Sequence, residues 1–186
     1  LMKRERLTVY WVLGVLCLLS VRAPAEENPV TGAQTERDWD TLYTLAENQP
    51  GEVLSWIEAF RAEVPGSGGD GLRGIRVDLL EAVACLYTSQ TGEARLLAEG
   101  ALERSRQRDA RLAEARSLNV LGMVTFFTRD YETAEASALD GLELLEELRE
   151  ETDGDFPERT IERLRAGAKS LLGNLATMRA DLATAS

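Results

Sequence analysis

The sequence predicts an all-α fold in which antiparallel helix pairs stack on one another. From Glu36 onward apolar residues recur at intervals of three and four, the period of one helix face. No stretch alternates apolar and polar residues in the way that a half-buried strand does. After residue 36 proline occurs only at Pro50, Pro65 and Pro157, each at a break between helical stretches.

The first 25 residues have the organisation of an export signal. Lys3, Arg4 and Arg6 precede an apolar run over 7–21, and small residues lead up to Ala25, where we expect cleavage. The alternative is an uncleaved membrane anchor, but the run is shorter than the ~20 apolar residues of a spanning helix. We therefore expect an exported protein, periplasmic or extracellular, with membrane contact only through this segment if it is retained.

Residues 26–35 are polar and rich in turn-forming types, so we expect a flexible leader there. Helices are then predicted over 36–47 and 52–63, 75–88 and 94–107, 110–127 and 131–151, and from about 157 onward. Short connections make consecutive helices antiparallel neighbours. The helical domain at 36–186 would contain four units, at 36–64, 75–107, 110–151 and 157–186. The last unit is incomplete, which favours a fragment of a longer protein.

The amino-acid composition, and above all the net charge, limits the classes of partner that the chain could bind. The chain carries 21 basic and 32 acidic residues and no histidine, for a net charge of −11, or −14 without residues 1–25. Nucleic-acid binding depends on clustered Lys and Arg, and an anionic membrane surface would repel this chain. The charge favours a basic or neutral protein partner.

Gly122 stands in the middle of an apolar helical run, "LNVLGMVTFF", where glycine is less favourable than alanine by roughly 1 kcal/mol. We expect a second helix to approach its backbone closely and offset this loss. The pattern recurs: "DYETA" at 130–134 returns as "DLATA" at 181–185, and Leu-Gly precedes each at the same interval. A looser copy places Ala84 in the glycine position. Small residues at 84, 122 and 173 would then mark close helix crossings.

These residues resemble the tetratricopeptide repeat, which has Leu-Gly in its first helix, a turn like Gly-Asp-Tyr, and a close-crossing Ala in its second. The match covers roughly residues 75–186 and is carried by Leu118, Leu121, Gly122, Tyr131 and Ala134, with Leu172, Gly173 and Ala185 repeating it. It departs at Thr125 and Ala176, where the family has a large aromatic. Its intervals of 38 and 51 residues also exceed the family's period of about 34.

The resemblance implies an α-solenoid scaffold that binds a protein or peptide in its concave face. By the family's pattern the partner-binding residues would be Arg116, Asn119, Met123, Phe126, Asn174 and Thr177. Phe127 and Ser170 fall on the same pattern, with Phe127 expected to belong to the core. The alternative is the sensory region of a larger membrane-bound signalling enzyme, such as a diguanylate cyclase or histidine kinase, whose catalytic domain would follow Ser186. The leading part of a secreted protein with a caspase-like domain has the same layout.

Catalysis within these residues is not expected. Without histidine, Ser-His-Asp and Cys-His arrangements and imidazole metal ligation are excluded, and Cys85 reads as a small buried residue. Gly66, Gly68 and Gly71 spell a dinucleotide fingerprint, yet a helix precedes them where a strand is required. The acidic stretch "TDGDFPERT" lacks the spacing of a calcium loop. The sequence thus predicts no catalytic residue, cofactor or metal site.

Overall fold

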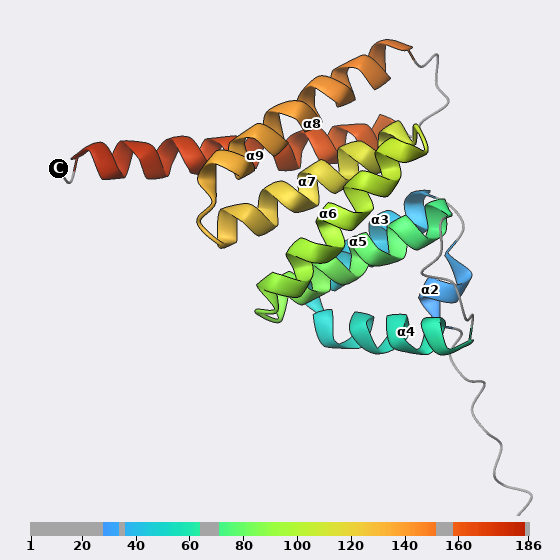
Figure 1. Ribbon diagram of the computed structural model, residues 1–186. Coiled ribbons are helices and arrows are strands. Elements are labelled where there is room, and N and C mark those ends of the chain that lie inside the picture. Colours follow the sequence, from blue (N-terminus) through green and yellow to red (C-terminus); the bar gives the residue numbers. More distant parts are fainter. Residues whose placement is uncertain (1–27, 34–35, 64–70, 152–157, 185–186) are drawn as a thin grey trace, which may run out of the picture.

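The computed structural model describes residues 28–33, 36–63, 71–151 and 158–184, and the predicted signal peptide lies outside them. Within these ranges eight helices pack as sequential antiparallel pairs (Figure 1). Their bounds are α2 Pro29–Gly32, α3 Glu36–Asn48, α4 Pro50–Glu63, α5 Leu72–Tyr87, α6 Thr91–Gln107, α7 Arg111–Phe127, α8 Tyr131–Glu151 and α9 Glu158–Thr184. The all-α prediction is confirmed, and the expected helix ends agree to within three residues, since proline, glycine and apolar periodicity are local signals.

Consecutive helices from α5 to α9 pack against each other, and α5, α7 and α9 also contact one another in turn. The largest fully buried side chains, which form the centre of this packing, include Ile75, Leu79, Leu80, Val124 and Leu145. Burying one such side chain contributes about 1.5–3 kcal/mol. The helix α3 contacts α5 and α9 as well as α4, and lies behind α5 in Figure 1. One face shared by α5, α7 and α9 is therefore next to α3.

The turns after α5 and α7 are built alike. Ser89 and Arg129 both have φ of 65°, and the hydroxyls of Thr88 and Thr128 donate to carbonyls four residues earlier at 3.0 and 3.1 Å. These positions are 40 residues apart. In this register Ala82, and not Ala84, is the counterpart of Gly122, so the interval of 38 taken from the sequence was wrong by two residues.

Gly122 lies at the close crossing that the sequence predicted. A Cβ at this position would lie 2.8 Å from Cδ2 of Leu171 on α9, and 3.5 Å from the carbonyl oxygen of Ala134 on α8. Glycine therefore lets α7 approach two helices at one point. The packing gained there offsets the helix propensity lost.

Gly173 does not have this role, which corrects the prediction drawn from the sequence repeat. It is exposed on α9, and a Cβ there would have no described atom within 4 Å. The helix α9 continues from Glu158 to Thr184, so its Leu-Gly pair falls mid-helix, far from any turn like those after α5 and α7. The sequence echo at this position does not correspond to a repeated contact.

Part of the expected leader is also structured. Asn28 caps the helical turn α2 by accepting a hydrogen bond from the Val30 amide at 3.0 Å, with Pro29 at the first position. The amide of Asn28 donates to the Trp56 carbonyl at 2.7 Å, and Arg73 donates to the Val30 carbonyl at 2.9 Å. Val30 is fully buried. Residues 28–33 thus pack beside α4, and the turn-forming residues that suggested flexibility form a helix cap.

Candidate functional site

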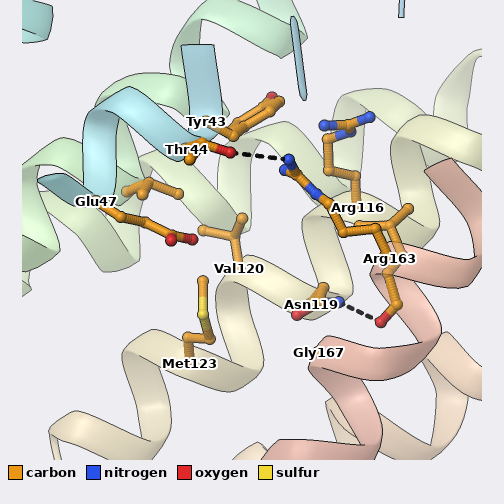
Figure 2. A pocket seen from close by; sticks show the side chains of 11 residues that line it. Tyr43, Thr44, Glu47, Arg116, Asn119, Val120, Met123, Arg163 and Gly167 are labelled. Carbon is orange, nitrogen blue, oxygen red and sulfur yellow. Dashed lines mark hydrogen bonds between the residues drawn. The ribbon is translucent and has the colours of Figure 1, made fainter. Parts of the chain in front are cut away.

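A cavity of about 240 Å³ opens between α3, α5, α7 and α9 (Figure 2). Charged, polar and apolar side chains all contribute to its lining. The lining residues are Tyr43, Thr44, Glu47, Val83, Arg116, Asn119, Val120, Met123, Arg163, Leu164 and Gly167. Pockets that enclose whole small molecules measure about 300–1,000 Å³, so this cavity has the size for one or two side chains.

Asp40 holds α3 in place above the cavity. Its Oδ1 accepts a 3.0 Å hydrogen bond from Arg116 of α7, and its Oδ2 accepts a 2.8 Å bond from the Thr160 hydroxyl of α9. Arg163 of α9 donates to the backbone carbonyl of Asp40 at 2.7 Å. The side chain of Arg116 is only 4 % exposed. Since a charge removed from water needs a partner, this cluster ties α3 to both α7 and α9.

Tyr43 forms the floor beside this cluster. Its hydroxyl donates to the carbonyl of Arg76 on α5 at 3.1 Å, and the guanidinium of Arg116 lies 4.5 Å from its ring centroid. Burial raises the pKa of Tyr43 to about 12, although the neighbouring Arg116 acts in the opposite direction. The ring is therefore neutral and fixed, and it shapes the cavity without contributing a charge.

Asn119 connects α7 to α9 on the opposite wall. Its amide nitrogen donates to the carbonyl of Leu164 at 2.8 Å (Figure 2), and a Cβ at Gly167 would lie 3.0 Å from that nitrogen. Glycine at 167 is thus what leaves room for the Asn119 amide. The amide orientation is set by α9, so this side chain is preorganised on the cavity wall.

The remaining side of the cavity is apolar and carries one carboxylate. Val83, Val120 and Met123 supply the apolar surface, and Glu47 stands beside them at the C-terminal end of α3. In Figure 2 the Glu47 carboxylate and the end of the Met123 side chain both point into the space between α3 and α7. Glu47 is exposed.

Three of the six predicted partner-binding residues meet in this cavity: Arg116, Asn119 and Met123. Phe126 instead packs between α8 and α9, with its ring centroid 5.9 Å from that of Tyr131. Asn174 and Thr177 are exposed further along α9, where the Thr177 hydroxyl donates to the carbonyl of its own helix at Gly173. A role for any of the six in binding stays a prediction.

Phe127 corrects a further expectation. The sequence placed it in the core, but 60 % of its surface is exposed. It is the last residue of α7, and its ring contacts Phe126 edge to face at 5.9 Å. Hydrophobicity alone could not place it, because the position of the turn decides which end residues lie outside the packed layer.

Sequence reasoning missed the α3 side of the cavity. Asp40, Tyr43, Thr44 and Glu47 recur at intervals of three and four, so they follow one helix face. That pattern was present in the sequence, yet it equally describes the solvated face of an amphipathic helix. The packing of α3 against α7 and α9 distinguishes the two.

Neither a family model, nor a curated protein, nor a solved structure matches the chain. In the described part of the chain, no helix combines the length and the apolar character needed to cross a bilayer. What can be said of function therefore comes from the cavity and the residues around it.

Proposed function

We propose that this chain is a tetratricopeptide-like scaffold that binds a protein or peptide partner at the cavity between α3, α7 and α9. The observation that carries the proposal is the cavity itself, in which residues of four helices offer apolar contact, hydrogen bonds and charge together. Its size suits side chains of a partner more than an enclosed small molecule. Binding, and not covalent chemistry, is what such a lining supports.

The arrangement of helices supports the same proposal. Stacked helix pairs present the first helix of each pair on one extended surface, which solenoid proteins use for partners. Here that surface would be formed by α5, α7 and α9. Asp40 holds α3 next to these helices. The partner would therefore bind between α3 and α7, and would not lie on an open concave face.

Charge and compartment complete the proposal. The net charge of −11 for the chain favours a partner that is basic or neutral. The organisation of residues 1–25 as an export signal would place the encounter outside the cytoplasm.

The test is site-specific photo-crosslinking in cells that produce the full chain. A benzophenone amino acid replaces Met123 in the cavity or, as the matched control, the exposed Leu139 on α8. We expect a discrete adduct from position 123 and none from 139. A second substitution, Thr44→Trp, should close the cavity and remove the adduct while leaving the helical circular dichroism signal intact. Equal adducts from both positions, or an adduct that survives Thr44→Trp, would reject this cavity as the binding site.

A further inference from the structure

Two exposed aromatic side chains follow the apolar residues of the cavity along the same helices. Val83 and Met123 line it, and Tyr87 and Phe127 lie four residues further along the same helices. Residues four apart share one helix face, and 87 and 127 hold the same place before their respective turns. Tyr87 is 46 % exposed and Phe127 60 % exposed. Aromatic rings in such positions are common anchors for a partner chain.

Glu47 of α3 and Val83 of α5 line the same cavity, and Tyr87 follows Val83 by one helical turn. Burial and, secondly, the negative charge of Glu47 raise the pKa of Tyr87. Val120 and Met123 of α7 line the same cavity as Glu47. A carboxylate bordered by apolar and aromatic side chains is well placed to receive a cation whose stem is apolar.

The two basic residues of the cavity lining form ion pairs with Asp40. Arg116 and Arg163 are directed to Asp40, and Arg163 also donates to the Thr44 hydroxyl at 3.2 Å. Asp40 thus offsets part of their charge where α3 meets α7 and α9. Two helical turns further along α3, the exposed Glu47 is the acidic residue of the cavity lining.

We propose that the segment bound here carries one arginine or lysine between apolar residues, with its cationic head at Glu47. The stem of that residue lies along Val120 and Met123, and the apolar neighbours rest on Tyr87 and Phe127. This inference rests on the proposed function and names the chemistry of its ligand. Shape and charge agree: the cavity has room for one long side chain, and the chain is acidic overall.

The experiment uses the full chain with methionine methyl groups labelled with carbon-13. The sequence has three methionines, so the Met123 signal is assigned by its loss in Met123→Leu, and Met178 serves as an internal reference. The probes are three blocked pentapeptides, Ala-Leu-X-Leu-Ala, in which X is arginine, norleucine or glutamate. Glu47→Gln is compared with Glu143→Gln, an exposed site on α8 that undergoes the same change in charge.

We expect the arginine peptide to shift the Met123 signal at the lowest concentration and the glutamate peptide to be weakest. Glu47→Gln should weaken binding of the arginine peptide about fivefold, as for an ion pair at an exposed carboxylate. Added salt should weaken this binding similarly. Glu143→Gln should change neither. Equal binding of the arginine and norleucine peptides, or no effect of Glu47→Gln, overturns the inference while the cavity remains a peptide site. If no peptide moves the Met123 signal, the proposed function at this cavity fails as well.

Discussion

Asp40 on α3 and Arg116 on α7 are 76 residues apart in sequence, and a 3.0 Å hydrogen bond joins their side chains. Thr160 of α9 completes the group from 120 residues away. A partly buried carboxylate thereby joins the first long helix of the described chain to the last. This contact places Glu47 and Thr44 on the cavity, because both follow Asp40 along the same helix face.

Asp40→Ala is expected to destabilise the protein by about 2–3 kcal/mol, since it leaves the buried guanidinium of Arg116 without its carboxylate. Asp40→Asn should cost less because an amide oxygen can still accept a hydrogen bond. Urea unfolding followed by circular dichroism gives the free energy of unfolding. Asp140→Ala, at an exposed site on α8, is the control and should change it by less than about 0.5 kcal/mol. Equal effects at the two aspartates would contradict the role given to Asp40.

Gly122 and Gly173 should respond in opposite directions to the same substitution. At the exposed Gly173, alanine gains helix propensity and should stabilise the protein by up to about 1 kcal/mol. At Gly122 the new Cβ would meet the buried Leu171 at 2.8 Å, and overpacking of about 1–3 kcal/mol should outweigh that gain.

Thermal unfolding of both variants measures the difference. The pair Gly122→Ala and Leu171→Ala should show positive coupling in a double-mutant cycle, because the smaller side chain makes room for the new methyl group. Stabilisation by Gly122→Ala alone would mean that the α7 crossing is looser than the structure shows.

The buried thiol of Cys85 should make the free energy of unfolding decrease at alkaline pH. Burial, followed by the nearby carboxylates of Glu81 and Glu93, raises the pKa of its thiol from 9.0 to about 11. The folded protein thus holds this proton more tightly than the unfolded chain does. The resulting stability is fully present below about pH 9 and is lost as the pH rises through about 11.

The free energy of unfolding should fall between about pH 9 and pH 11. This fall should be smaller in Cys85→Ala than in the unchanged protein. Part of the fall should remain in the variant, since burial also raises the pKa of Tyr43 to about 12. Identical pH profiles for the two proteins would show that the thiol is not protected from solvent.

The turns before α6 and α8 lie 40 residues apart and are built alike, so their capping residues can be compared directly. The carboxylate of Asp130 accepts a hydrogen bond from the Thr133 amide at 3.3 Å, and hydrogen bonds from Thr133 lower the pKa of Asp130. Its counterpart before α6 is Gln90, whose side chain makes no capping hydrogen bond. Asp130→Ala should lower the melting temperature and Gln90→Asp should raise it, because aspartate is a favoured N-cap residue.

Acid distinguishes effects of the Asp130 carboxylate charge, which include its 3.2 Å ion pair with Arg95 as well as the cap, from effects that do not depend on charge. The contribution of Asp130 is present above its ordinary pKa and is lost as the pH falls through its lowered value, so the deficit of Asp130→Ala should shrink in acid. The gain of Gln90→Asp should shrink likewise. A gain that is independent of pH would indicate that the new carboxylate does not cap α6.

The sequence by itself determined where the helices lie and that Gly122 is a close contact. Apolar spacing, proline breaks and the loss of propensity at a mid-helix glycine are local properties, so they can be read without knowing what packs beside them. The resemblance to the tetratricopeptide pattern, and not these local properties, selected Arg116, Asn119 and Met123, which do meet at one cavity.

Only the tertiary structure decided what that face meets. Whether a polar stripe such as Asp40 to Glu47 is covered depends on contacts with residues 76 and 120 positions away, which leave no local signature. The same holds for Gly173, whose Leu-Gly pair repeats that of Gly122 although no described helix lies against it. A helix carries its periodicity in its own residues, but its neighbours are set by the balance of packing over the whole chain.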